Sequence, residues 1–332
     1  MRVARVLAYL LFAGTVAYGQ DASWQEHMTA AAALRGKGLY REALKQLEEA
    51  LQAARALDRD DERQAITRDA LAAAYDALGQ FWQAEKCQRE AVAVAERILG
   101  PENPRLGVPL NNLANIYREE GKFEAARDVG RRALHLLDRE ASPASSLAAI
   151  LGNLGMVAYD QRELVEAEGL LRRAVDTAER LPETESSLYA EALNNLALVY
   201  ERQGRQRDAL ALLQLANSAI ERAHGLEHPR SSHLLVNIAS IQGELGETDQ
   251  AIQTFERGIA AAEKGFGPNH PLIGEALARE ARLLRKLHRK REAATLDARA
   301  RAIAREATTN NFRQYIVEAP DGASGKSTIR RR

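Results

Sequence analysis

The sequence predicts an all-α protein: a right-handed superhelical solenoid built from seven helix-turn-helix hairpins. The first observation is an alanine that recurs every 41 or 42 residues, with another small residue twelve positions before it and a third seven positions after it. The second is a composition rich in Ala, Leu, Arg and Glu with only 5% aromatic residues, which favours helices. Repeated small residues mark places where two helices approach closely. The period therefore predicts one array of repeats along the 332 residues.

The recurring alanine opens the second helix of each hairpin. The seven positions are Ala43, Ala84, Ala126, Ala167, Ala209, Ala251 and Ala293. Five residues earlier, five of the units carry a glycine, where a tight helical turn needs a residue that tolerates positive φ. These glycines are Gly38, Gly79, Gly121, Gly204 and Gly246. Arg162 and His288 take that position in the fourth and seventh units, so we expect those two turns to be strained or differently closed.

The period also sets the boundaries along the chain. The array covers residues 25–306, with hairpins at about 25–58, 65–100, 107–140, 146–181, 188–224, 230–266 and 272–306. Beyond it, Thr308 to Asn311 reads as a polar break and Phe312 to Val317 as a short extended run. We therefore expect residues 307–332 to form a C-terminal tail that is partly disordered or docked on the last repeat.

The first nineteen residues have the layout of a secretory signal peptide. Arg2 and Arg5 precede an apolar run from Val6 to Val16, and small residues stand at Ala17 and Gly19. An uncleaved anchor is the alternative, but the run is shorter than the roughly 20 residues that a bilayer span needs. We therefore expect a signal peptide at residues 1–19 and an exported, periplasmic or secreted protein without a membrane span, with a bacterial envelope suspected. Cys87 is the only cysteine, so no internal disulfide is possible and a small packing role is expected.

Residues that could support chemistry are few. The run Gly325 to Thr328 ends like a phosphate-binding loop, but Pro320 stands where the first glycine of that loop belongs. His224, His228 and His233 lie close together, yet His228 belongs to a recurring loop pattern, which favours a structural role over a zinc site. We expect no catalytic residue, metal or cofactor. The balance of 46 basic and 46 acidic residues also argues against a nucleic-acid surface.

Two recurring motifs suggest a family. N-N-L-A-x-x-Y occurs at residues 111–117 and 194–200, and G-x-x-[NH]-P occurs at 100–104, 225–229 and 267–271. Together with the small residues and the turn glycines, they resemble the tetratricopeptide repeat, in the longer form of the kinesin light chain-like branch. The resemblance covers residues 25–306. It implies that the first helix of each hairpin lines the inside of a superhelix.

In that family an asparagine two residues before the first small position often hydrogen-bonds the backbone of a bound peptide. The resemblance therefore implies a peptide-binding groove, and the predicted residues are Asn111, Asn112, Asn115, Asn153, Asn194, Asn195, Asn237 and Arg279. An amide can both donate to and accept from an extended backbone. The alternative is that these amides bond the neighbouring helix and only fix the stacking of repeats. Glu191 and Glu275 stand where a carboxylate clamp needs Lys, so an internal peptide segment is favoured over a free C-terminus.

The resemblance implies a non-enzymatic scaffold or adaptor that binds a protein or an extended peptide segment in its groove. Two other functions stay open. One is a self-assembling structural or regulatory protein of the cell envelope, and the other is an accessory subunit of an enzyme complex. The partner and the oligomeric state do not follow from the residues.

Overall fold

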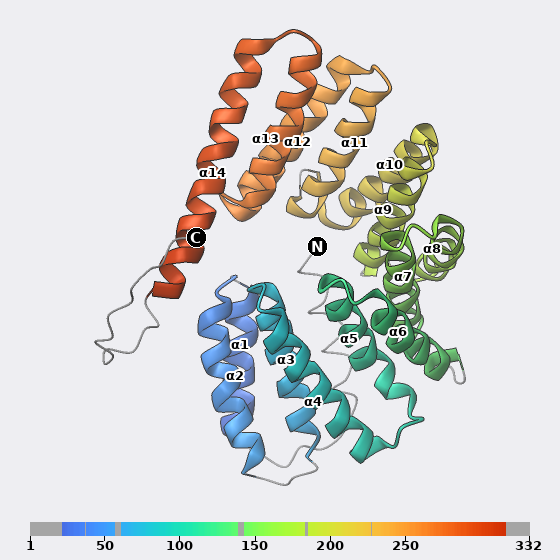
Figure 1. Ribbon diagram of the computed structural model, residues 1–332, viewed down its shortest axis with the longest axis vertical. Coiled ribbons are helices and arrows are strands. Elements are labelled where there is room, and N and C mark those ends of the chain that lie inside the picture. Colours follow the sequence, from blue (N-terminus) through green and yellow to red (C-terminus); the bar gives the residue numbers. More distant parts are fainter. Residues whose placement is uncertain are drawn as a thin grey trace, which may run out of the picture. The chain divides into compact units, whose positions relative to one another are not determined.

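The computed structural model describes residues 22–36, 38–56, 61–138, 143–182, 185–226 and 228–316. Every regular element in these ranges is a helix, and the helices pair into seven hairpins (Figure 1). The pairs are α1 (Ala22–Gly36) with α2 (Tyr40–Arg55), α3 (Glu62–Ala77) with α4 (Phe81–Leu99), α5 (Gly107–Glu119) with α6 (Phe123–Asp138), α7 (Ala144–Asp160) with α8 (Leu164–Ala178), α9 (Ser186–Arg202) with α10 (Gln206–His224), α11 (Ser232–Glu244) with α12 (Thr248–Phe266), and α13 (Pro271–Lys286) with α14 (Lys290–Ile316). The predicted all-α array is confirmed.

The helices form two compact units, with unit 1 ending at Ala219 and unit 2 beginning at Ile220, inside α10. In unit 1 the second helix of each hairpin packs on the first helix of the next, as α4 does on α5 and α6 on α7. In unit 2, α12 packs on α13 in the same way. First helices also meet directly: α5 with α7, α7 with α9, and α11 with α13. Each unit therefore presents a face made of first helices.

The small residues lie where the hairpins close. All seven alanines that open the second helices are at most 1% exposed, so no larger side chain would fit between the paired helices. The paired helices of the fourth unit approach closely at Gly155, which replaces the usual alanine on the first helix. A Cβ added to Gly155 would lie 2.6 Å from Leu171 Cγ on the paired helix α8. This hairpin therefore packs closely enough to require glycine.

The turns between paired helices share one geometry. The five turn glycines have φ between 72° and 84°, and Arg162 and His288 adopt the same left-handed conformation at 64° and 62°. The closing hydrogen bond is also the same, since Lys122 N donates to Tyr117 O at 2.8 Å and Glu163 N to Ala158 O at 2.9 Å. These two turns are therefore strained, as expected for residues with a Cβ, but they are not differently closed.

The G-x-x-[NH]-P loops join one hairpin to the next by capping a helical turn. Asn103 and His228 precede the short 3₁₀ helices Pro104–Leu106 and Pro229–Ser231, and His270 precedes α13. In each case the side chain accepts a hydrogen bond from the backbone N–H two residues later, and proline occupies the first helical position. The loop histidines His228 and His270 thus have the structural role that the motif predicted.

The C-terminal end differs from the expectation. Helix α14 continues to Ile316, so the polar break at Thr308 to Asn311 and the extended run after it are wrong up to that residue. Thr and Asn are weak helix formers but not breakers, and the first proline after α14 is Pro320. Residues 1–19 and 317–332 lie outside the described ranges, so the signal peptide and the rest of the tail stay predictions. Within the described ranges no helix combines the length and hydropathy of a membrane span.

Candidate ligand-binding face

The predicted site residues all lie on first helices. Asn111, Asn112 and Asn115 are on α5 and Asn153 is on α7. Asn194 and Asn195 follow on α9, Asn237 on α11 and Arg279 on α13. Asn112, Asn153, Asn195, Asn237 and Arg279 each stand two residues before the small residue that packs on the paired second helix. Two residues correspond to about 200° of rotation around an α-helix. These side chains therefore point away from the second helix of their own hairpin.

In unit 1 the amides connect successive repeats. Asn112 Nδ2 donates to Asp69 Oδ1 at 3.1 Å, and Asn153 Nδ2 donates to Asn111 Oδ1 at 2.9 Å. Asp69 Oδ1 also accepts from Gln88 Nε2 at 2.6 Å, which binds the α3–α4 hairpin to this network. The alternative role, in which the amides fix the stacking of repeats, thus has direct support.

The two bridging amides still have an acceptor left. Asp69 and Asn111 accept hydrogen bonds from the Nδ2 atoms of Asn112 and Asn153. No donor in the described part of the chain bonds to Oδ1 of Asn112 or Asn153. The orientation of Asn112 follows from its partner, because an ionised carboxylate can only accept. Both side chains are half-buried rather than enclosed. Asn112 and Asn153 can therefore offer a carbonyl oxygen to an N–H group on a ligand.

The other predicted amides of unit 1 are less accessible. Asn111, Asn115, Asn194 and Asn195 are all buried. Asn115 accepts from Arg118 at 3.5 Å and donates to the Glu119 carboxylate at 3.3 Å. Asn194 donates to its neighbour Asn195 at 3.5 Å. The structure thus divides the predicted set into buried amides, of which Asn111 bonds to the next repeat, and half-buried amides that stay partly exposed. The peptide-binding role of all eight residues stays a prediction.

In unit 2 the face carries charge. Arg279 stands two residues before the small residue, where the third to sixth hairpins have asparagine, and donates to Asn237 Oδ1 at 3.3 Å and to Ser240 Oγ at 3.4 Å. Its second amino group donates to Glu275 Oε1 at 2.5 Å, forming an ion pair. Because Glu275 compensates the guanidinium, Arg279 is a weaker anchor for an acidic ligand than its sequence position suggested.

Sequence reasoning missed the partners of two arginines on the first helices of unit 1, Arg118 and Arg202. Arg118 forms an ion pair with Asp160 at 3.1 Å, and Arg202 donates to Tyr159 O at 3.2 Å while stacking 4.1 Å from the centre of the Tyr159 ring. The signal was present, because these partners are 42 and 43 residues apart. Residues one period apart lie side by side, so a search for donors and acceptors at that separation finds them.

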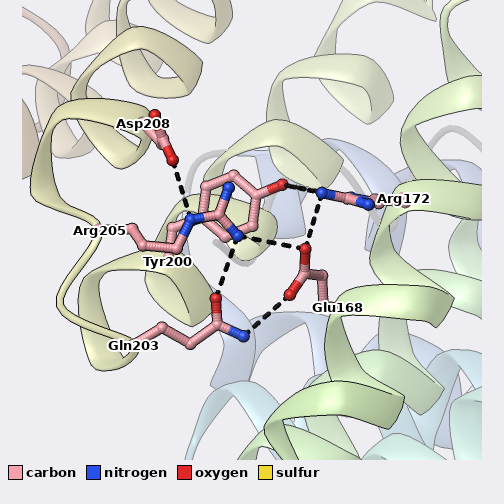
Figure 2. Close-up of polar contacts among 6 residues, drawn as sticks. All are labelled: Glu168, Arg172, Tyr200, Gln203, Arg205 and Asp208. Atoms are coloured by element: carbon pink, nitrogen blue, oxygen red, sulfur yellow. Dashed lines mark hydrogen bonds and ion pairs between the residues drawn. The ribbon is translucent and has the colours of Figure 1, made fainter.

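A second polar cluster, between the fourth and fifth hairpins, is structural (Figure 2). Glu168 on α8 accepts from Gln203 at 2.9 Å and pairs with Arg205 at 3.3 Å, while Arg172 donates to the Tyr200 hydroxyl at 2.9 Å. Arg205 lies 3.7 Å from the centre of the Tyr200 ring and also pairs with Asp208 at 2.8 Å. Every charge has a nearby counter-charge, so this cluster locks two repeats together and offers little to a ligand.

Candidate reactive groups give no indication of catalysis. Burial raises the pKa of the half-buried Cys87 thiol to about 11, so the thiolate that would act as nucleophile is scarce at neutral pH. The described residues include no group of three or more His, Cys, Asp and Glu placed to hold a metal ion. His224 and His228 stack on each other, with ring centres 4.7 Å apart, at the α10–α11 loop.

Comparison with known proteins agrees with this architecture. The sequence pattern of the tetratricopeptide repeat matches residues 26–97, 79–139, 146–216 and 230–306. BtubC (BKLC) from P. vanneervenii is 16% identical over 77% of this chain and 97% of its own, with a TM-score of 0.55. A putative kinesin light chain from Podosopora anserina, with nearly identical TPR-like repeats, is 20% identical over 61% of this chain and 98% of its own, with a TM-score of 0.50. A Rap protein complexed with competence and sporulation factor is 15% identical over 92% of each chain, with a TM-score of 0.59.

No curated protein sequence matches the chain. At these identities the solved structures establish the fold alone. The repeat pattern, however, matches most of the sequence from residue 26 to residue 306. The chain belongs to the tetratricopeptide repeat family, in a form similar to the kinesin light chain-like repeats.

Proposed function

We propose that this protein is a non-enzymatic scaffold that binds an extended segment of another protein along the first helices α5 and α7. The observation that carries the proposal is the pair of half-buried amides Asn112 and Asn153, whose Oδ1 atoms keep acceptor capacity after their Nδ2 atoms are used between repeats. An extended backbone presents N–H donors at regular intervals, which suits two such acceptors one repeat apart. The similar Rap structure, solved with competence and sporulation factor, gives a precedent for a ligand on such a solenoid.

We propose that the part of the ligand that binds Asn112 and Asn153 is uncharged. Asn112 and Asn153 carry no charge, and the nearby Arg118 is already paired with Asp160. A buried charge on the ligand would lose its hydration without gaining a free counter-charge. An internal peptide segment fits these conditions better than a free carboxylate.

The experiment must separate ligand contact from repeat stacking, and the Asn153–Asn111 hydrogen bond provides a matched pair of variants. Asn153→Ala and Asn111→Ala remove the same bond from its two ends, so each should cost about 1 kcal/mol of stability. Only Asn153 is placed to touch a ligand. We expect peptides selected from a random display library on the full chain to bind Asn153→Ala at least tenfold more weakly, and Asn111→Ala less than threefold more weakly, in fluorescence anisotropy.

Equal losses of affinity in the two variants would show that Asn153 acts through stacking alone. A library that yields no binding peptide would contradict the scaffold proposal itself. Urea unfolding of both variants, followed by circular dichroism, checks that they lose similar stability.

We also propose that the protein is exported to a bacterial envelope or secreted, on the basis of residues 1–19 alone. N-terminal sequencing of the protein purified from its source would test this location. An intact Met1 would contradict cleavage of a signal peptide.

A further inference from the structure

Three loops between hairpins use the same cap with different chemistry. Each cap joins a side-chain acceptor to the backbone nitrogen two residues later, at 2.9 Å for Asn103, 3.2 Å for His228 and 3.3 Å for His270. The acceptor is an amide oxygen in Asn103 and the ring nitrogen Nδ1 in the two histidines. The Asn103 loop belongs to unit 1, and both histidine loops belong to unit 2.

The two acceptors respond differently to acid. An amide oxygen accepts a hydrogen bond at any pH from roughly 4 to 9, because it does not titrate in that range. An imidazole nitrogen accepts only while it is unprotonated, and both nitrogens of the imidazolium are donors. Protonation of His228 or His270 would therefore set a donor against the backbone N–H that it now caps.

The surroundings of His228 make a positive charge on its ring costly. Its ring stacks on His224 of α10, and Arg230 lies 3.4 Å from His224 Nε2. The charged neighbour from the packed helix α12 is Lys264. Burial, His224, Arg230 and Lys264 together lower the pKa of His228, and burial and Arg230 lower that of His224. Acid would thus collect four cations at this loop. Glu227 of the same loop lies outside the described residues.

His270 repeats this arrangement at the α12–α13 loop with one difference. Its ring lies 4.7 Å from that of Phe266, in the position that His224 holds beside His228. Burial lowers the pKa of His270 as well. The α12–α13 loop therefore shares the proton-sensitive cap but lacks the second titrating ring.

We propose that the two histidine-capped loops of unit 2 are acid-sensitive N-caps. When His228 and His270 are protonated, the caps are lost and the first turns of α11 and α13 open. Above the ordinary histidine pKa of about 6.5, folded and unfolded chains are both neutral at these positions and the caps are complete. As the pH falls, the unfolded chain takes up protons first, so folding stability is lost toward acid. Opening at α11 would displace Asn237, whereas the Asn103 loop of unit 1 keeps its cap.

The test is the double variant His228→Asn and His270→Asn in the full chain, which gives unit 2 the cap that unit 1 already has. Amide hydrogen exchange along residues 232–244 and 271–286, corrected for intrinsic exchange, is measured at pH 7.5 and pH 5.5. We expect protection in the natural protein to fall about fivefold between the two values, from the loss of N-cap hydrogen bonds. With His233→Asn present in both proteins, the fall in the double variant should be less than twofold. Comparing the two proteins cancels the other titrating groups.

Two controls identify the caps as the cause. His135→Asn removes an exposed histidine of α6 and should leave the caps untouched. Burial lowers the pKa of His233 on α11 to about 4, so His233 adds its own acid-dependent loss of stability along residues 232–244. His233→Asn measures that contribution, and the cap variants are therefore compared in its background. His135→Asn should retain the full acid-dependent loss of protection, and His233→Asn should retain the part that the caps cause. An equal loss of protection in the double variant and in the natural protein would overturn the proposal.

Discussion

Glu280 departs from the repeat at a position that is otherwise apolar. The residue just before the first small position is Leu71, Leu113, Leu154, Leu196 and Ile238 in units two to six, and each is buried. Glu280 takes this place in the seventh unit and is only 6% exposed. Burial, together with Glu256 on the neighbouring helix α12, raises the pKa of Glu280 from 4.5 to about 7. A carboxyl group thus lies where the fold provides an apolar environment.

This raised pKa predicts that Glu280→Leu stabilises the protein more at high pH than at low pH. The folded chain keeps a proton that the unfolded chain releases, so stability falls as the pH rises from about 4.5 to about 7 and is then constant. We expect the variant to gain on the order of 1–3 kcal/mol at pH 8 and clearly less at pH 5. Urea unfolding at both values measures the difference.

Glu244→Leu is the matched control, since Glu244 is an exposed carboxylate at the end of α11. It should change stability little at either pH. A Glu280→Leu variant with the same gain at pH 5 and pH 8 would show that packing, and not the proton, accounts for the effect. The slope due to Glu280 opposes that of the histidine caps over an overlapping pH range, so the two effects partly cancel in the stability of unit 2.

At the scale of helices, three successive joints between hairpins carry ion pairs of alternating direction. Glu85 on α4 pairs with Lys122 at 2.6 Å, and Glu168 on α8 pairs with Arg205 at 3.3 Å. In the joint between them the signs are exchanged, because Arg127 on α6 pairs with Glu163. These residues occupy equivalent positions, so the third and fourth hairpins each bring the same charge to both of their joints.

The alternation penalises incorrect stacking. If one hairpin were skipped, Glu85 would meet Glu163 and Arg127 would meet Arg205, two like-charged pairs in place of opposite ones. Each exposed pair is worth less than about 1 kcal/mol, but correct and skipped stacking then differ by several such terms. Misassembly of neighbouring units is a characteristic failure of repeat proteins. The charges therefore favour the correct order of hairpins.

This interpretation predicts that the double variant Arg127→Glu with Glu163→Arg refolds poorly. The exchange keeps an opposite pair in the native joint but makes both skipped pairings attractive. The control is Arg127→Gln with Glu163→Gln, which removes the native pair without rewarding the skipped one. We expect both double variants to lose no more than about 1 kcal/mol of stability, and the exchanged variant alone to give a lower yield of native protein after dilution from urea. Equal yields would contradict the role of alternating charge.

At the scale of the whole molecule, the last hairpin has an open groove where the equivalent surface of the sixth hairpin is covered by α13. In the sixth hairpin, Phe255 and Ile259 are buried against Ile273 and Leu277 of α13. The equivalent positions of the seventh are Asp297 and Arg301, which line a groove of about 480 Å³ between α13 and α14. Asp297 is paired with Arg285. With Asp297 and Arg301 in this groove, stacking another hairpin on the last one would bury charged side chains and little apolar surface.

Asp297→Phe with Arg301→Ile should therefore make the protein associate. The change restores the residues that seat α13 inside the array and exposes an apolar surface at the end of unit 2. Sedimentation velocity should show an average mass that rises with concentration for this variant but not for Asp297→Asn with Arg301→Gln. Unchanged sedimentation of the apolar variant would show that something other than charge keeps the end free.

The sequence by itself determined the features that depend on local order along the chain. The alanine period, the turn glycines and the capped loops at Asn103, His228 and His270 each act within one hairpin or between neighbours, so their spacing predicted the helical hairpins. The prediction that the last helix ends before Thr308 was wrong, because Thr308 to Asn311 are poor helix formers that a continuing helix tolerates. Local preference is weak where no glycine or proline ends a helix.

Only the tertiary structure decided which amides a ligand can reach. Asn111 and Asn112 are adjacent in sequence and both belong to the same motif, yet Asn111 is buried beneath Asn153 and Asn112 is half-buried beside Asp69. Helical periodicity gives the direction of a side chain on its own helix. The hydrogen-bond partner comes from a neighbouring repeat, the next one for Asn111 and the preceding one for Asn112, and its placement depends on how the hairpins stack.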